Sequence, residues 1–439
     1  MNASFKVGIA REKITPPLGT VLYGYPNMRR AESTHDDLNL TAYAFSSGER
    51  SVLMISADIC VLGEDEATPL RKMISAETGV AFENITFSAT HTHSGPCTRF
   101  SAGWGEKDTE FLNLILKPAA IKASIRAVGN MQEAEMGVGC GESLVGINRR
   151  ERCLDGAIAL GQNPYGIFNK DMNVISFRST GGKLIGSIVH YGAHNTASGA
   201  TPVITRDWSG VMVDALERET GALATFFSGP TGDTGPRLSN GKTTGNIDLM
   251  VELGKKAGED AVRIFNSITE WKAPTLNVIS DTLRIPYEPL MKYEKAKELL
   301  CALLKKAPYE ELYGRDKKAA KKYMDVIAHY EKNLPDEDAL YLKVTAISLD
   351  DLVFCQFPFE VFGEIGLRIA AHSPYAKSLI LNNTNGSLAY FPTKSEIAVG
   401  GYEVQMFSWF QTYTPVADSD TVAVNEYVRI LNNLKLSSE

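Results

Sequence analysis

Two histidines one residue apart, His91 and His93, lie in the stretch Ser88-Ala-Thr-His-Thr-His-Ser-Gly-Pro96. Residues 84–88 before them are rich in β-branched and aromatic side chains and predict a short buried strand. Side chains two apart in a strand point to the same side, so both imidazoles are expected to leave the strand end together. Neutral imidazole is the commonest metal ligand, and the pair indicates a metal site. The alternative is a chance pair on a solvated turn, because two nitrogens do not complete a zinc site.

The elements around this stretch predict an α/β fold. Residues 51–59 read as a strand that ends near Asp58, residues 64–78 as a helix, and the histidine strand follows. Strand, helix and strand in this order indicate a parallel pair joined by a right-handed crossover. We therefore expect a mixed, largely parallel sheet or sheets flanked by helices. Ligand sites gather beyond the carboxyl ends of such strands, so Asp58 and His91 are expected at the same edge, with a zinc site there.

Other candidate polar groups also follow predicted strands. His190 stands at the far end of a strand over residues 184–191, and His194 comes a few residues later. A strand over residues 224–228 runs into a Gly-rich loop that presents Asp233. The spacing from Gly235 to Gly241 is one residue too long for a phosphate-binding loop, and this excludes nucleotide binding there.

Composition narrows the class of protein. The chain has 439 residues, of which 44% are hydrophobic and 22% charged, and this composition is ordinary for a soluble enzyme. The net charge of -7 does not indicate nucleic-acid binding. No apolar run approaches the roughly 20 residues of a membrane span. The six cysteines are scattered without a Cys-x-x-Cys pair and no signal peptide is visible, so we expect a cytoplasmic protein with reduced thiols.

Domain organisation is predicted to be simple. We expect one catalytic domain over residues 1–439, with a charged, glycine-poor helical insertion at about 289–333 that is a solvated addition or a lid. Residues 146–150 read as a polar loop.

Several motifs together resemble the N-terminal catalytic domain of the neutral/alkaline, non-lysosomal ceramidases and their shorter bacterial relatives. They are spread over nearly the whole chain in family order: Thr90-His-Thr-His-Ser-Gly-Pro96, Gly146-Ile-Asn-Arg149, His190 with Thr205-Arg-Asp207-Trp-Ser-Gly210, Gly232-Asp233, and Phe357-Pro-Phe-Glu360 leading to Tyr390 and Gly401-Tyr402-Glu403.

The resemblance implies a zinc site and a substrate site. The implied zinc ligands are His91, His190, Glu360 and Tyr390. The implied substrate contacts are His93, Arg149, Tyr402 and, from a weaker match, Gly24. Without the resemblance, Glu360 could simply start its helix and Tyr390 could anchor a loop.

The implied chemistry is consistent with the residue types. Zinc lowers the pKa of bound water to near 7 and polarises a carbonyl, which speeds attack on an amide or ester. Asp233 is a candidate general base or an orienting group, and His93 could donate to the forming oxyanion.

The sequence departs from the ceramidases in two ways. Where the family has Gly-Asp-x-Ser-Pro, this chain has Gly232-Asp233-Thr234-Gly235-Pro236, so water on zinc must replace any serine nucleophile. The C-terminal β-sandwich domain of the ceramidases is not expected either. Both differences weaken the case for ceramide itself.

Three functions therefore stay open. The first is a zinc-dependent hydrolase of C–N bonds, acting on an N-acyl amide that is a small molecule or lipid-like. The second is a zinc hydrolase of an ester, lactone or glycosidic bond in a small polar substrate. The third is a metal-retaining homologue without turnover.

Overall fold

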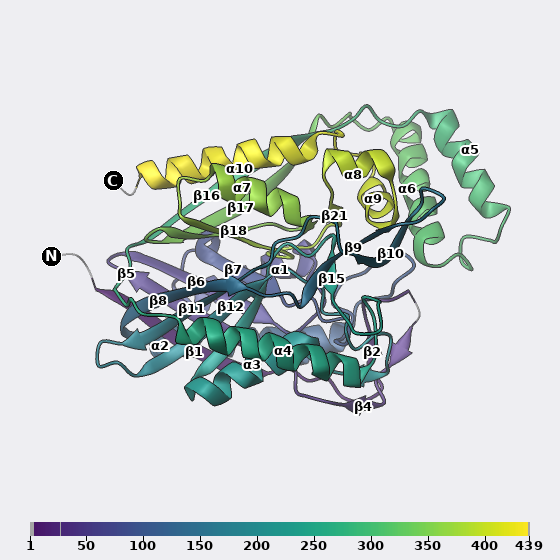
Figure 1. Ribbon diagram of the computed structural model, residues 1–439. Coiled ribbons are helices and arrows are strands. Elements are labelled where there is room, and N and C mark those ends of the chain that lie inside the picture. Colours follow the sequence, from purple (N-terminus) through teal and green to yellow (C-terminus); the bar gives the residue numbers. More distant parts are fainter. Residues whose placement is uncertain (1–3, 27, 438–439) are drawn as a thin grey trace.

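Two β-sheets stacked face to face form the centre of the structure, and helices cover both outer faces, giving four layers (Figure 1). The computed structural model describes residues 4–26 and 28–437. No helix in these two ranges is long and apolar enough to cross a membrane.

The larger sheet has eight strands in the order β14-β12-β11-β8-β1-β5-β6-β7. Their bounds are β1 (Phe5–Lys13), β5 (Asn39–Ser47), β6 (Arg50–Ala57), β7 (Ile85–Ala89), β8 (Gln132–Glu142), β11 (Asp171–Ser179), β12 (Leu184–Tyr191) and β14 (Leu223–Ser228). Only the β6–β7 and β12–β14 pairs are parallel, and the remaining pairs are antiparallel. The expectation of a mixed sheet flanked by helices is confirmed, but the expectation of largely parallel pairing is wrong. Short connections such as Ser47 to Arg50 allow only antiparallel neighbours.

The smaller sheet has four strands in the order β16-β17-β18-β20. Their bounds are β16 (Leu276–Pro286), β17 (Ala339–Leu349), β18 (Leu352–Gln356) and β20 (Lys377–Leu381). Here again one pair, β18–β20, is parallel and the others are antiparallel.

Each of these three parallel pairs is joined by a helix, as parallel strands require. The helices are α1 (Glu64–Thr78) between β6 and β7, α3 (Asp207–Thr220) between β12 and β14, and α7 (Gly363–His372) between β18 and β20. The segments that leave the carboxyl ends of these strands carry the candidate site residues.

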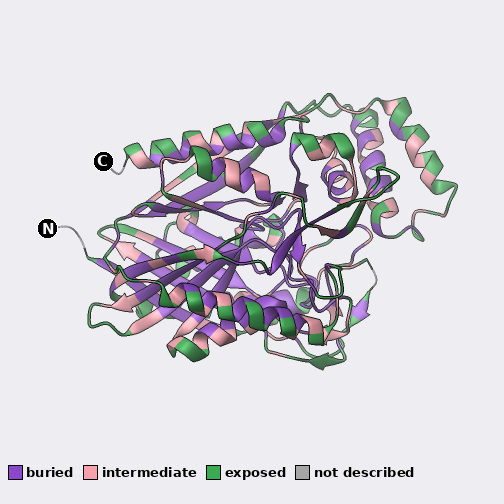
Figure 2. Cartoon of the chain, viewed as in Figure 1, coloured by how far each residue is buried: buried purple, intermediate pink, exposed green. Residues whose placement is uncertain are grey.

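Three apolar layers hold the sheets and helices together (Figure 2). Between the sheets, Phe45 and Phe177 of the larger sheet share one buried cluster with Phe354 of the smaller. Outside the larger sheet lie α1, α2 (Lys117–Gly129), α3 and α4 (Ile247–Asn266), and outside the smaller sheet lie α7 and α10 (Ser419–Leu436). A π-helical turn, Phe111–Leu116, precedes α2, and a short 3-10 turn, Phe82–Asn84, precedes β7.

Smaller elements gather at the end of the molecule opposite the two termini (Figure 1). They are α5 (Tyr293–Leu304), α6 (Gly314–Glu331), α8 (Lys394–Val399), α9 (Tyr402–Ser408), β9 (Gly146–Arg152), β10 (Ile158–Asn163) and β15 (Thr234–Pro236). Two further two-stranded pairs are β2 (Val21–Leu22) with β3 (Arg29–Arg30), and β4 (Ser33–Thr34) with β13 (Val203–Ile204). The segment expected to be a polar loop is strand β9, and the expected helical insertion is formed by α5 and α6.

We predict that Phe354→Ala destabilises the protein by about 3–5 kcal/mol, because it opens a cavity in the layer between the sheets, where Phe354 is fully buried. Urea unfolding followed by circular dichroism measures this. Leu114→Ala, at a side chain that is 68% exposed, is the matched control and should change the free energy of unfolding by less than about 0.5 kcal/mol. Equal effects of the two substitutions would contradict the role of this layer.

Candidate metal centre

His91, His194 and Glu360 form a buried cluster, and each could offer one metal-binding atom within 4.8 Å of the others. His91 follows β7, His194 follows β12 and Glu360 follows β18, so each residue lies just beyond the carboxyl end of a strand in a parallel pair. The two stacked sheets thus bring three distant segments to one place, as open α/β sheets generally do.

The backbone and ring of His91 are both constrained. Its φ of 68° lies in the left-handed region, which non-glycine residues seldom occupy. The strand has already ended at Ala89, so strand alternation is not what orients this side chain. Nδ1 lies 2.8 Å from the carbonyl oxygen of Cys60, to which it can donate, and this leaves the Nε2 lone pair directed at Glu360, 3.3 Å away.

The ring of His194 is held in the same way. Its Nδ1 lies 2.8 Å from the carbonyl oxygen of Thr231, and its Nε2 lies 3.0 Å from Oε2 of Glu360. The start of α3 fixes the loop that carries this histidine. Trp208 donates its indole N–H to the His194 carbonyl at 2.9 Å, and the Asp207 carboxylate accepts the N–H groups of the loop at residues 197 and 198.

This arrangement suits a divalent cation. Two imidazole lone pairs and a carboxylate would repel one another at these distances unless positive charge lay between them. Ligand atoms about 2.0–2.1 Å from zinc in tetrahedral geometry are about 3.3 Å apart, close to the 3.0 and 3.3 Å separations from Glu360. The carbonyl partners of both Nδ1 atoms are of the kind that orients metal-bound histidines.

The charges in the cluster also favour a cation at its centre. Burial disfavours the charged form of His91, but the Glu360 carboxylate outweighs this and raises the pKa of His91 well above its usual range. Burial likewise disfavours ionised Glu360, yet the two histidines hold its pKa well below the usual value. The cluster therefore favours positive charge at its centre.

Tyr390 lies beside this cluster. A short parallel pair, β19 (Glu360–Val361) and β21 (Tyr390–Phe391), puts Glu360 and Tyr390 in register. The Tyr390 ring stacks on His194 with centroids 6.3 Å apart. The Tyr390 phenol oxygen is thus a candidate fourth metal ligand beside the cluster.

His190, which was predicted to be a ligand, is not part of the cluster. It still lies within β12, where its Nε2 is 2.8 Å from the carbonyl oxygen of Ile380 and its ring packs against Gly229. Burial lowers the pKa of His190 to about 4. His194, four residues further on, occupies the place expected for it. The end of the strand distinguishes the two histidines. His190 is still paired within the sheet, whereas His194 follows the last residue of β12.

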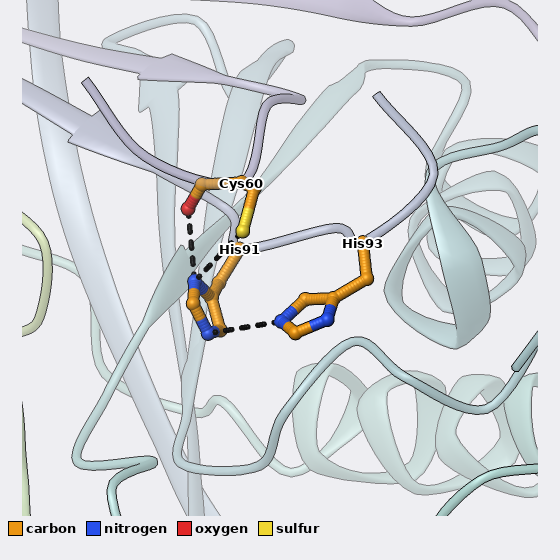
Figure 3. Close-up of side chains that lie close together, drawn as sticks. All are labelled: Cys60, His91 and His93. Atoms are coloured by element: carbon orange, nitrogen blue, oxygen red, sulfur yellow. Dashed lines mark hydrogen bonds between the residues drawn. The ribbon is translucent and has the colours of Figure 1, made fainter. Parts of the chain in front are cut away.

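His93 faces the cluster from the other side, and Figure 3 shows it beside His91 and Cys60. The Nε2 atoms of His91 and His93 are 3.3 Å apart, and the His93 Nδ1 is buried without a hydrogen-bond partner among the described residues. Burial and the neighbouring histidines hold the pKa of His93 well below its usual value. Gly24 has a φ of 110°, and a Cβ there would lie 2.4 Å from the His93 ring, so glycine is needed for this contact.

Cys60 was missed by the sequence reasoning. Its Sγ lies 3.6 Å from Nδ1 of His91, and Cys60, His91 and His93 form a second group with possible metal-ligand atoms. A lone cysteine three residues past the end of β6 carries no spacing signal, so only the fold identifies it.

Arg149 and Tyr402 are positioned by a buried ion-pair network. Glu403, fully buried, accepts from Nε of Arg149 at 2.9 Å and from Arg150 at 2.6 Å, which joins β9 to α9. The Arg149 guanidinium lies 5.2 Å from the Tyr390 ring centroid, and the Tyr402 ring is 5.6 Å from Tyr390. One terminal nitrogen of Arg149 is buried without a partner among the described residues, so it is available to a ligand.

Asp233 lies behind the cluster. Its carboxylate accepts from the N–H of Gly363 at 2.8 Å, at the start of α7, and from the side chain of Asn148 at 3.3 Å. Its carbonyl oxygen accepts from the N–H of Arg149 at 2.7 Å. These contacts suit an orienting group better than a general base. Asp58, which was expected at the same edge, instead accepts from the N–H of Asn39 and shares a separate small cavity with Arg206.

Gly235, at the place of the family serine, is in β15. A Cβ there would lie 2.7 Å from Cγ2 of Thr243, so this backbone has no room for a serine unless Thr243 moves. The absence of that hydroxyl is therefore built into the packing.

The cluster opens into a narrow cavity of about 70 Å³, which we call the inner chamber and which is lined by His91, His93, Glu360, Tyr390 and Tyr402 among others. On one side a larger cavity of about 1450 Å³, the outer groove, shares His93, Tyr390 and Tyr402 with it and adds Tyr25 and Arg149. A third cavity of about 760 Å³, the side cavity, adjoins the chamber through Arg99 and Lys318. The inner chamber thus borders a larger cavity on each of two sides.

Comparison with solved structures identifies the fold. The neutral ceramidase from Pseudomonas aeruginosa superposes with a TM-score of 0.74, with 18% identity over 99% of this chain and 75% of that one. A ceramidase complexed with C2 superposes with a TM-score of 0.70, with 18% identity over 98% of this chain and 76% of that one. No family model and no curated protein matches the sequence. The chain has the neutral ceramidase fold, and this confirms the resemblance expected from the motifs at the level of fold.

We predict that His194→Ala abolishes stoichiometric binding of a divalent metal, whereas His190→Gln retains it, because only His194 directs a nitrogen at Glu360. Metal content after dialysis against zinc, measured by mass spectrometry, tests this. Circular dichroism of both variants controls for folding. Loss of metal in folded His190→Gln with retention in His194→Ala would restore the original assignment.

A second prediction concerns Asp233, whose pKa burial raises from 3.8 to about 7. The folded protein holds a proton there that the unfolded chain releases near pH 4, so this carboxyl makes folding less favourable as pH rises from about 4 to 7. Relative to Asp233→Asn, the free energy of unfolding of the wild type should fall over that range by at most about 1.4 kcal/mol per pH unit. Urea unfolding at several pH values measures the difference, and parallel curves for the two proteins would contradict the prediction.

Proposed function

We propose that the protein is a zinc-dependent hydrolase that cleaves an N-acyl amide, with water as the nucleophile. The proposed zinc ligands are His91, His194, Glu360 and Tyr390. The main support is the convergence of two imidazole Nε2 atoms on one carboxylate oxygen, at 3.0 and 3.3 Å, with both Nδ1 atoms next to carbonyl oxygens. The neutral ceramidase fold gives independent support for the amide bond as the target.

Zinc, when bound, would supply a Lewis acid that lowers the pKa of water and polarises the substrate carbonyl. The other residues would bind and orient the amide. His93 lines the inner chamber, where a ring N–H can donate to the oxygen of the attacked carbonyl. Arg149 and Tyr402 line the outer groove, where they can contact the part of the substrate beyond the scissile bond.

The nucleophile is assigned to water because the candidate side chains are poorly suited. Gly235 removes the hydroxyl of the family serine. Cys60 does line the inner chamber, and its sulfur is 3.6 Å from His91, but the same His91 nitrogen is 2.8 Å from the Cys60 carbonyl oxygen. A cysteine hydrolase is therefore the alternative to test.

The test uses an N-acyl amine, such as N-hexanoyl-4-nitroaniline, and its ester counterpart, 4-nitrophenyl hexanoate. We expect hydrolysis of the amide that is lost on chelation and restored by zinc. His93→Gln should lower kcat about 100-fold with zinc content unchanged, because one donor to the developing charge is lost.

Cys60→Ser is the control for the nucleophile and should keep zinc content and most of the activity. Loss of activity in Cys60→Ser with zinc retained would favour the cysteine mechanism. Hydrolysis of the ester alone would favour the second function, and turnover of neither by the zinc-loaded protein, across a panel of N-acyl amines, would contradict an amide hydrolase.

A further inference from the structure

Two cations that the proposed chemistry does not use lie in the wall between the inner chamber and the side cavity. Arg99 follows the histidine stretch, and Lys318 comes from α6, the helix of the predicted insertion. Both line the inner chamber together with His91, His93 and Glu360, and both also line the side cavity. The insertion thus supplies a charged group to the site.

Neither cation has a carboxylate partner among the described residues. The Arg99 guanidinium donates to the carbonyl oxygens of Ser387 and Leu388, which uses only part of its five N–H donors. Lys318 is half-buried, and its ammonium has no hydrogen-bond or ion-pair partner in the part of the chain that the structure describes. Its three donors are unused.

Neighbouring lysines on the same helix differ. Lys321 pairs with Asp325 at 2.5 Å, and Lys322 donates to Ser408 and Thr414 at 2.9 and 2.7 Å. An ammonium that is drawn out of water without compensation costs free energy. Of these three lysines of α6, Lys318 is therefore the one without a hydrogen-bond or ion-pair partner among the described residues.

No acidic side chain that lines either cavity forms an ion pair with Arg99 or Lys318 among the described residues. Asp65, which lines the side cavity, pairs with Lys107, and Asp325 pairs with Lys321. Glu64 also lines the side cavity but not the inner chamber. A divalent metal in the cluster would add further positive charge, so the chamber favours an anion.

We propose that Arg99 and Lys318 bind a carboxylate of the substrate, so that the protein acts on N-acyl amides that carry a free carboxylate near the scissile bond. This assignment rests on the proposed function, since it concerns the same site. The narrow chamber, about 70 Å³, suits a small planar anion whose carboxylate reaches Lys318 while the amide lies at the cluster.

The protonation of Lys318 supports this view. Burial, together with the charge of Arg99, lowers the pKa of Lys318 to about 7. An anion bound between the two cations would raise the pKa of Lys318 again. Anion binding and protonation of Lys318 therefore favour each other.

The experiment compares two pairs of amides in which one member is anionic and the other neutral. N-hexanoylglycine and its carboxamide carry the group on the amine side, and N-glutaryl-propylamine and its carboxamide carry it on the acyl side. We expect the wild type to prefer the anionic member of one pair by at least about tenfold in KM, the effect of one hydrogen bond to a charged group. The preferred pair identifies the side that faces Lys318.

Lys318→Gln should abolish this preference by raising KM for the anionic member only, with kcat little changed. Lys321→Gln, which breaks an exposed ion pair on the same helix, is the matched control and should keep the preference. The proposal is overturned if the wild type does not distinguish the members of either pair, or if Lys318→Gln affects both members equally.

Failure of the hydrolase proposal is distinguished by binding. If no amide is cleaved, calorimetric titration of glutarate into metal-free protein still tests the carboxylate site. Binding that Lys318→Gln weakens at least about tenfold and Lys321→Gln does not would support the site on its own. No binding, or equal binding by all three proteins, would overturn it.

Discussion

The structure depends on holding two imidazoles and a carboxylate together with their electron pairs directed at one point. His91, His194 and Glu360 are buried, and without positive charge between them their mutual repulsion would oppose folding. The protein holds them through groups outside the cluster, namely carbonyl oxygens next to both Nδ1 atoms and a β19–β21 pair beside Glu360. Cation binding would therefore stabilise a geometry that the scaffold has already formed.

The scaffold achieves this with a few parallel strand pairs inside mostly antiparallel sheets. The β6–β7, β12–β14 and β18–β20 pairs each direct their carboxyl ends toward the same end of the molecule, where the insertion helices α5 and α6 also lie (Figure 1). The stacked cluster that contains Phe177 and Phe354 fixes one sheet against the other. The packing between the sheets therefore sets the geometry of the cluster, because His91 and His194 follow strands of one sheet and Glu360 follows a strand of the other.

Around the cluster, charge is distributed unevenly. On the side of the outer groove, the Arg149 charge is shared with buried Glu403. On the side of the inner chamber, Arg99 and Lys318 have no such carboxylate partner among the described residues. In this chain the site therefore combines a paired cation on one side with two cations that, within the described parts of the chain, lack a carboxylate partner on the other. The fold alone does not define the substrate, since specificity arises from the residues that line the cavities.

The sequence by itself determined the resemblance to the ceramidase fold and the approximate positions of several candidate residues along the chain. His91 could be singled out from a local motif, because a strand end is encoded over a short distance, whereas Glu360 and Tyr390 were named only through the resemblance to the ceramidases. Only the tertiary structure separates His190 from His194, since sheet pairing shows that His190 still lies within β12 whereas His194 follows its end. It also placed Lys318 beside the site, because no local pattern records that α6, far along the chain from His91 and His93, contributes to the wall of their cavity. Contacts between distant segments depend on how the layers stack, and a linear pattern carries little information about stacking.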